Sequence, residues 1–390
     1  MTRLYLLEPE DPGLAWAPFT GVRPIAELRA GAWRIRERWE AVIGTEAVGI
    51  IGPHVEGFVE DGVPPVVPAT SVVGPAIVAA SWFAPEGTPV PGLDEATALV
   101  HDGQVVAWRI APGARWEGPR QAGGGVEIAG LPLLGTYDLL TALEHLLVSD
   151  CADFLTHAGD ELPSGSIVLG DPAEIVSLGA AIEPGVVFDV RHGAVVLEEG
   201  VEVRSGTRLE GPVYAGPGTR ILGGFIRQAV FGPECRVRGE ISTSVFLGYG
   251  NKAHDGFVGH SVLGVWTNLG AGTTTSNLKN TYGEVRLAFA GRQVDTGRIN
   301  VGSLIGDHAK TAIGTLLSTG TVIGAGANVF GTVMPPKYLP PFAWGCEATG
   351  RLDEERFLLI AERVLPRRNV QMTDAIRASL RAIYRRAVQS

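Results

Sequence analysis

The chain has 390 residues, including 53 Gly and 26 Pro, with 45% hydrophobic and 19% charged residues. So many turn formers combined with that hydrophobic fraction indicate a folded, turn-rich protein and exclude a disordered one. The formal net charge of −10 argues against nucleic acid or an anionic membrane as the main partner, but it allows a local basic pocket. The three cysteines have no metal-ligand spacing and the first residues form no apolar signal sequence, so a cytoplasmic protein is expected.

Residues 1–155 are predicted to form an α/β domain. RLYLLE at 3–8 is typical of a first strand, and ALVHDGQVVAWRI at 98–110 is typical of two strands joined around Asp102-Gly103. Between them, apolar residues from Ile25 to Trp39 recur every three or four positions, which predicts helical structure. A second helix is predicted after Thr136, in YDLLTALEHLLV.

Several arginines follow the polar side of the first helical stripe. They could belong to a solvated helix with ion pairs, which the charge pattern alone favours, or they could form an edge that binds phosphate. On the second interpretation Arg23, Arg29 and Arg36 are candidate ligands for a nucleotide or a sugar phosphate.

The segment PFTGVRPIAELRAGAWRIRERW at 18–39 resembles the region that follows the phosphate loop in sugar-nucleotide pyrophosphorylases. More specifically it resembles the opening of GlmU-related proteins, bifunctional UDP-N-acetylglucosamine diphosphorylase/glucosamine-1-phosphate acetyltransferases. The resemblance implies transfer of a nucleotidyl group from UTP or dTTP to a sugar 1-phosphate with Mg²⁺. The glycine-rich GxGTR loop and a metal-binding Asp at the end of a strand are both absent, so binding alone or a structural role stay open.

From Ile167 the sequence becomes a six-residue repeat, which fits neither a helix nor a hairpin. This period predicts a solenoid of parallel strands at 165–340, with three flat sides per coil and the repeating residues pointing inward. By resemblance to hexapeptide-repeat transferases the solenoid is a left-handed β-helix. The predicted inward positions are Val195, Val201, Thr207, Val213, Thr219, Phe225, Phe231, Val237, Thr243, Tyr249, Phe257, Leu263, Leu269, Thr275, Ile299, Ile305, Thr311, Leu317, Ile323 and Val329. Residues 351–388 are predicted to be helical and to cap the solenoid or to form a trimer contact.

The step from Tyr249 to Phe257 is eight residues, and this break contains Lys252, His254 and Asp255. A histidine suits proton transfer near neutral pH, although it could equally satisfy backbone groups in a turn.

The surrounding segment KAHDGFVGHSVLGVWTNLGAGTTTSN resembles the acetyltransferase half of GlmU, with its KAGH…YLGD…NIGAGTxxxN pattern. The resemblance implies that His254 is the general base, that Glu240 orients it, and that Asn277 contacts sugar and acetyl group. Asn268 opens the matching NLGAGT. Phe257 replaces a tyrosine, and Ser242 replaces the lysine that holds the sugar phosphate.

Several further residues complete the expected site. Lys252, Lys279, Arg227 or Arg286 could supply the missing phosphate contact. Acetyl-CoA, the implied co-substrate, is expected beside later coils, with Ala312, Ile313, Ala325 and Lys337 as candidates, and the family implies a homotrimer.

Two other functions stay open. Hexapeptide-repeat γ-carbonic anhydrases bind zinc through three histidines, and this chain offers His254, His260 and His308. A sugar-nucleotide-binding scaffold without catalysis is the other alternative.

Overall fold

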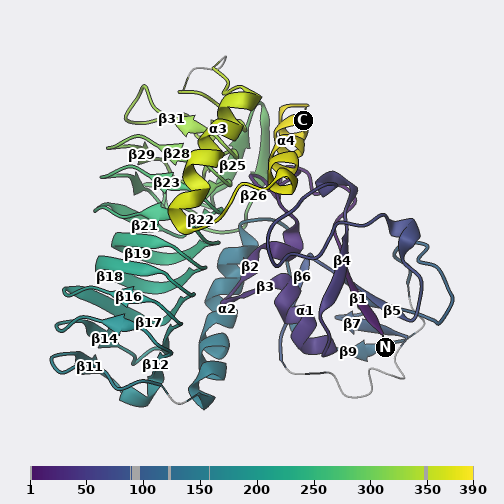
Figure 1. The fold of residues 1–390 in the computed structure, drawn as a ribbon, viewed down its shortest axis with the longest axis horizontal. Helices are drawn as coiled ribbons and strands as arrows, with labels where there is room; N and C mark the ends of the chain where they lie inside the picture. The colour runs from purple at the N-terminus through teal and green to yellow at the C-terminus, as the bar shows by residue number, and fades with distance from the viewer. Residues whose placement is uncertain are drawn as a thin grey trace. The chain divides into compact units, whose positions relative to one another are not determined.

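The computed structural model describes residues 2–87, 89, 97–121, 124–157, 159–346 and 350–389 (Figure 1). The chain forms two compact units. The N-terminal unit comprises Met1–Trp16, Thr20–Leu134 and Thr373–Ser390, and the solenoid unit comprises Ala17–Phe19 and Gly135–Met372. The predicted ranges 1–155, 165–340 and 351–388 stay a prediction, since a compact unit need not fold as an independent domain.

The N-terminal unit is built on a six-stranded sheet of order β4-β1-β5-β8-β7-β9. Strand β1 runs parallel to β4 and β5, and β8 runs antiparallel to β5 and β7, which confirms the predicted first strand and the hairpin at Asp102-Gly103. The strands are β1 (Arg3–Leu7), β2 (Arg29–Ala30), β3 (Trp33–Arg34), β4 (Ala47–Ile51), β5 (Ala76–Ala80), β6 (Phe83–Pro85), β7 (Ala98–His101), β8 (Gln104–Ile110), β9 (Val126–Glu127) and β10 (Gly130–Pro132).

The predicted helical stripe becomes a short 3-10 turn (Ile25–Glu27) followed by helix α1 (Ile35–Ile43). The side chain of Glu37 accepts the Arg34 backbone N–H at 2.7 Å, which satisfies a free donor at the start of α1. The helix ends at Gly44, whose φ of 74° suits a residue without Cβ. Trp39 is fully buried and its indole N–H donates to the carbonyl of Ala80, so α1 packs on the sheet through its apolar face. The last helix, α4 (Asp374–Gln389), also belongs to this unit.

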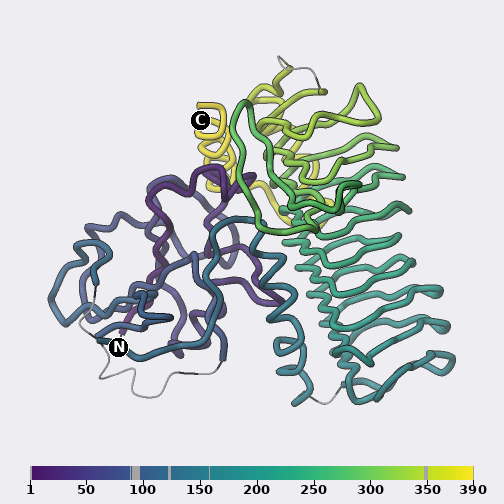
Figure 2. Tube along the Cα trace, turned by 180° about the vertical axis from the view of Figure 1, so that it is seen from behind, coloured from purple at the N-terminus to yellow at the C-terminus, as the bar shows by residue number. Residues whose placement is uncertain are grey.

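The solenoid unit contains an eighteen-stranded parallel sheet in the described part of the chain, wound into stacked coils (Figure 2). Its strands are β11 (Ile167–Leu169), β12 (Ile175–Ser177), β13 (Ala181–Ile182), β14 (Val187–Asp189), β15 (Val195–Leu197), β16 (Glu202–Val203), β17 (Thr207–Ala215), β18 (Arg220–Phe231), β19 (Arg236–Phe246), β20 (Asn251–Lys252), β21 (Phe257–Gly259), β22 (Val262–Leu263), β23 (Asn268–Leu269), β27 (Ser303–Ile305), β28 (Lys310–Thr311), β30 (Thr321–Ile323), β31 (Asn328–Val329) and β32 (Tyr338–Leu339). The pair β24 (Thr274–Thr275) and β29 (Leu316–Leu317) continues one flat side. The predicted fold class, an α/β domain followed by a left-handed β-helix, is confirmed.

Most predicted inward positions are buried in the solenoid, but five are not part of its inward columns. Phe225 and Phe257 face outward on one flat side, Thr243 and Tyr249 lie at corners with positive φ, and Ile299 is 53% exposed. The reason is that the coils vary in length. Ala229 pairs with Ser244, so that coil takes 15 residues, whereas an ideal repeat takes 18.

Two helices pack on the solenoid within this unit. Helix α2 (Asp138–Asp153) lies against β17, β18 and β19, and buries its predicted leucine side. Helix α3 (Glu354–Val364) places Phe357 against His308 and Phe342 near the end of the solenoid, so the predicted helical cap holds for α3. Among the described residues, none of the helices is both long and apolar enough to cross a membrane.

Candidate active site

One coil of the solenoid, residues 251–269, carries most of the predicted site. Its straight sides are β20, β21, β22 and the start of the next coil at β23, and three corners join them. We name these the His254 corner (253–256), the His260 corner (260–261) and the Trp266 corner (264–267). The two histidines therefore lie at opposite ends of β21.

The His254 corner exposes its imidazole to solvent. Phe257 follows it on β21 and lies in register with Glu240 of β19, so both side chains share the flat side next to this corner. Arg238 ties the corner to the preceding coil, since its guanidinium donates to the Asp255 carboxylate at 2.9 Å. The structure thus brings His254, Glu240 and Phe257 to adjoining parts of one surface.

Lys252 does not lie on that surface. Its side chain is fully buried, and its Nζ donates to the backbone carbonyls of Arg238, His254 and Asp255. The predicted substrate contact of Lys252 is therefore wrong for this structure, because the residue occupies an inward column between Val237 and Leu269.

Asn268 lies on the flat side that precedes the His254 corner, where its Oδ1 accepts from Asn251 Nδ2 at 2.9 Å. The GAGT turn after it stacks on the His254 corner, since the N–H of Gly272 donates to the Asp255 carbonyl at 3.0 Å. The two halves of the motif are therefore neighbouring layers of one corner.

Asn277 contacts the other histidine. Its Nδ2 lies 2.7 Å from Nδ1 of His260, and the same nitrogen would lie 3.1 Å from a Cβ added at Gly259. Burial lowers the pKa of His260 to about 4, with Glu144 opposing the shift and Arg298 and Arg227 adding to it, so the ring is neutral at physiological pH.

Residues far apart in the chain surround His260. Arg298 donates to the Thr141 hydroxyl and, at 2.8 Å, to the Glu144 carboxylate, both on α2. Arg227 donates to the Ser242 hydroxyl at 3.3 Å. Sequence patterns named His260, Asn277 and Arg227 for separate roles but did not predict this cluster, because α2 lies outside the repeat.

The candidate CoA residues divide between corners. Ala312 and Ile313 belong to the stack that starts at the His254 corner, because the Gly314 N–H donates to Ala271 at 2.7 Å, and Ile313 is 78% exposed. Ala325 is buried on the Trp266 corner stack beneath Phe342, so the structure does not bring it to the same surface.

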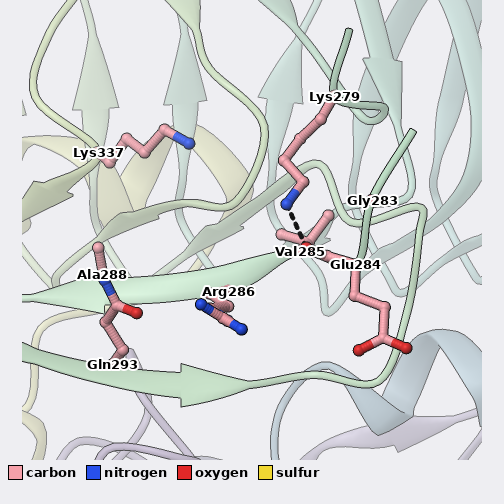
Figure 3. A pocket seen from close by; sticks show the side chains of 8 residues that line it. All are labelled: Lys279, Gly283, Glu284, Val285, Arg286, Ala288, Gln293 and Lys337. Atoms are coloured by element: carbon pink, nitrogen blue, oxygen red, sulfur yellow. Dashed lines mark hydrogen bonds between the residues drawn. The ribbon is translucent and has the colours of Figure 1, made fainter. Parts of the chain in front are cut away.

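Lys279 and Lys337, predicted for different ligands, line one pocket of about 610 Å³ (Figure 3). The hairpin β25 (Arg286–Phe289) and β26 (Arg292–Asp295) supplies much of its wall. Lys279 Nζ donates to the Glu284 carbonyl, and Arg286 pairs with Asp295 at 2.7 Å. Three cationic side chains thus line one open pocket, and one of them, Arg286, is paired with a carboxylate.

The predicted arginines of the N-terminal unit are buried instead. Arg36 is 8% exposed and binds Glu27 at 2.5 Å and Glu40 at 2.9 Å, and Arg23 is 3% exposed and binds Glu60. Arg29, 5% exposed, donates to the Ala32 carbonyl. The ion-pair interpretation therefore describes Arg23 and Arg36 better than the phosphate-binding one.

A Mg²⁺ ion for nucleotidyl transfer would need carboxylate ligands near the strand ends of this unit. Glu8, the carboxylate after β1, is 3% exposed and accepts the backbone N–H groups of Ile25 and Ala26 at 2.7 and 3.0 Å. Ser81 and Trp82 follow β5. Among the described residues, no group of three or more acidic, His or Cys side chains is placed to hold a metal ion.

The zinc alternative requires His254, His260 and His308 to converge on one metal ion. His254, His260 and His308 lie on three different corners, with His308 stacked against Trp266 at 6.2 Å between ring centroids. They do not converge on a common point within the chain, so the described residues give the zinc hypothesis no support.

Comparison with known proteins agrees with both units. Residues 9–157 match the family model described as sugar nucleotidyl transferase. A bifunctional sugar-1-phosphate nucleotidylyltransferase/acetyltransferase of Sulfurisphaera tokodaii is 35% identical over 147 residues, covering 35% of each chain. Bifunctional GlmU proteins of Stenotrophomonas maltophilia (30% over 184 residues; 41% of this chain, 38% of the relative) and Methanococcus maripaludis (32% over 90 residues; 23% and 22%) also match.

These matches show that the chain is similar to GlmU-like proteins over part of its length. The matches span between about a fifth and two fifths of the relatives' own length. The match to the sugar nucleotidyl transferase model covers helix α2 and every strand of the six-stranded sheet except β1, and a parallel β-helix follows it.

Proposed function

We propose that the solenoid unit transfers the acetyl group of acetyl-CoA to the amino group of an amino-sugar 1-phosphate. The main observation in support of this acetyl transfer is the His254 corner. It holds an exposed imidazole beside a flat side bearing Glu240 and Phe257, and a glycine-rich turn stacks on it.

In the proposed reaction the sugar amine attacks the thioester carbonyl. The C–N bond forms and the C–S bond breaks, and His254 takes a proton from the nitrogen and delivers it to the leaving CoA sulfur. Glu240 stabilises the imidazolium that forms, as a carboxylate does beside a catalytic histidine. Backbone N–H groups of the turn 270–273 are candidates to stabilise the oxyanion.

The acceptor sugar is proposed to bind on the flat side between the His254 and His260 corners. Arg227 lies in register with Ser242, the position where the family has its phosphate-binding lysine, and its exposed guanidinium can take over that contact. Asn277 borders the same side from the His260 corner, held in place by its hydrogen bond to that ring.

Acetyl-CoA is proposed to lie across later coils of the same side. Leu316, Val333 and Met334 are 39%, 61% and 61% exposed there, and Ile313 stands at the adjacent corner, which suits an apolar pantetheine arm. The pocket formed by Lys279, Arg286 and Lys337 offers cations for its phosphates. A homotrimer is proposed from the family resemblance, and light scattering of the purified protein measures it.

The deciding experiment measures acetyl transfer to glucosamine 1-phosphate by mass spectrometry in wild type and in His254→Ala. Loss of the general base is expected to lower kcat by about 10²–10⁴-fold. His192→Ala, which removes another exposed solenoid histidine, is the matched control and should keep the wild-type rate. A wild type without acetyl transfer would favour the scaffold alternative, and a full rate in His254→Ala would exclude this base.

A second activity, nucleotidyl transfer, is proposed for the N-terminal unit on the single ground that residues 9–157 match the sugar nucleotidyl transferase model. Release of pyrophosphate from UTP or dTTP with N-acetylglucosamine 1-phosphate and Mg²⁺ tests it. Absence of pyrophosphate would assign this unit a binding or structural role, in keeping with its buried arginines.

A further inference from the structure

Lys252 is unusual because it fills an inward column of the solenoid with an amine. Its neighbours above and below in that column are Val237 and Leu269, both buried and apolar. A buried ammonium is costly unless its donors are satisfied. Here the three N–H groups have three acceptors, the carbonyls of Arg238, His254 and Asp255.

These carbonyls are available because two adjoining coils differ in length at this corner. In the lower coil the inward residues Val237 and Ile241 are four apart, whereas their register partners Lys252 and Val258 are six apart. The His254 corner therefore has two more residues than the corner beneath it. Regular strand pairing cannot satisfy all carbonyls across such a mismatch, so some of them need another donor.

At this mismatch in coil length, two glycines lie where a side chain would clash with the backbone of the next coil. Gly239 and Gly256 have φ of 98° and 134°, and a Cβ at Gly256 would lie 2.2 Å from the Thr273 carbonyl and 3.3 Å from Lys252 Nζ. The ammonium therefore sits in a tight space directly behind the histidine's backbone.

We propose that Lys252 is a positioning residue, which fixes the His254 corner from inside the solenoid by binding the carbonyl of His254 itself and so aims the imidazole at the acceptor amine. The contribution of Lys252 to catalysis rests on the proposed acetyl transfer. Its anchoring of the His254 corner does not depend on that proposal.

Burial lowers the pKa of Lys252 to about 8, with Asp255 opposing the shift and Arg238 adding to it. The anchor should therefore weaken as pH rises above 8, since the neutral amine binds carbonyls less strongly than the ammonium. Lys310 provides a matched control, because burial also lowers its pKa to about 8 and its Nζ binds a backbone carbonyl, that of His308, at another corner.

The experiment compares Lys252→Met, Lys252→Gln and Lys310→Met by hydrogen–deuterium exchange of residues 250–258 and by kcat as a function of pH. Met fills the column without donors, and Gln keeps two donors in case Met prevents folding. Both Lys252 variants are expected to raise amide exchange in this segment about tenfold and to lower kcat by about 10²-fold for Met, the cost of a misplaced catalytic group. Lys310→Met should keep the wild-type exchange and the wild-type fall in kcat above pH 8.

Wild-type exchange and wild-type kcat in both Lys252 variants would overturn the proposal. A wild type that does not transfer acetyl groups would refute the proposed function, yet exchange at 250–258 would still decide whether Lys252 anchors the corner. Faster exchange with an unchanged kcat would refute the positioning role and leave only a structural one.

Discussion

The two groups of cations in this chain differ in what they contact. Arg23 and Arg36 in the N-terminal unit are buried and bound to Glu60, Glu27 and Glu40. In the solenoid unit, Lys279, Arg286 and Lys337 line an open pocket, with Asp295 as the carboxylate partner of Arg286.

The difference shows why a cluster of basic residues in a sequence is weak evidence for a phosphate site. Burial disfavours the charge of Arg36, but the hydrogen bonds that its guanidinium donates to Glu27 and Glu40, together with the attraction of these carboxylates, outweigh burial and raise its pKa, so its charge is committed to holding the fold. A ligand would have to replace these carboxylates. The pocket lysines need no such exchange, so they are the better candidates for a substrate phosphate.

The largest expected effect follows from breaking the buried network. Arg36→Met leaves Glu27, whose side chain is fully buried, with an ion pair to Arg34, and should lower the free energy of unfolding of the N-terminal unit by about 3–5 kcal/mol. Urea unfolding followed by tryptophan fluorescence measures it, since six of the eight tryptophans belong to this unit.

The control is the double variant Glu27→Leu/Arg36→Met, which removes both charges and should recover much of the loss. A phosphate-binding role for Arg36 predicts the opposite pattern, a stable Arg36→Met variant that loses affinity for nucleotide.

The sequence predicted the solenoid well because its signal is repeated many times. The prediction of inward positions is wrong where coils shorten to 15 residues. There a fixed count of six places Thr243 and Tyr249 inward, whereas in the structure they form corners. The same count missed Lys252 as a core residue, because a lysine in an inward column contradicts the apolar pattern that defines the repeat.

The candidate site was predicted in part. A local motif located the His254 corner, its neighbour Phe257 and the turn at Gly270–Thr273, which lie close in sequence. The contact between Asn277 and His260 and the approach of Glu144 depend on how the excursion after β24 (277–298) returns to the coil and where α2 packs. Such non-local contacts produce no periodic pattern in the sequence.

A second prediction concerns the two lysines that line the open pocket of the solenoid unit. Lys279→Met and Lys337→Met should each raise the KM for acetyl-CoA by roughly 10-fold, the value of one hydrogen bond to a charged group, and leave kcat within about twofold. Steady-state kinetics at two salt concentrations measures it, since screening should weaken the wild type more than the variants. The matched control is Arg204→Met, an exposed solenoid cation outside this pocket. An unchanged KM in both lysine variants would remove the pocket from the CoA site.

The smallest expected effect concerns His260, a half-buried group of the solenoid whose charge is suppressed instead of paired. Its pKa of about 4 lies below the ordinary 6.5, so between these values the unfolded chain binds more protons than the folded one. The contribution to stability is therefore complete above pH 6.5 and is lost as pH falls towards 4. Glu144, Arg298 and Arg227, the charged groups that face the ring, stay in place in a His260→Gln variant.

We expect His260→Gln to be nearly as stable as wild type at pH 7.5, since glutamine can still bond Asn277, and to lose less stability than wild type on going to pH 5. Urea unfolding followed by circular dichroism at both pH values measures this difference. His192→Gln, at an exposed position, should keep the wild-type pH dependence. Equal pH dependence in His260→Gln and wild type would show that folding does not lower the pKa of His260. The ring would then be protonated at pH 5, and Asn277 would be held there by a charged partner instead of a neutral one.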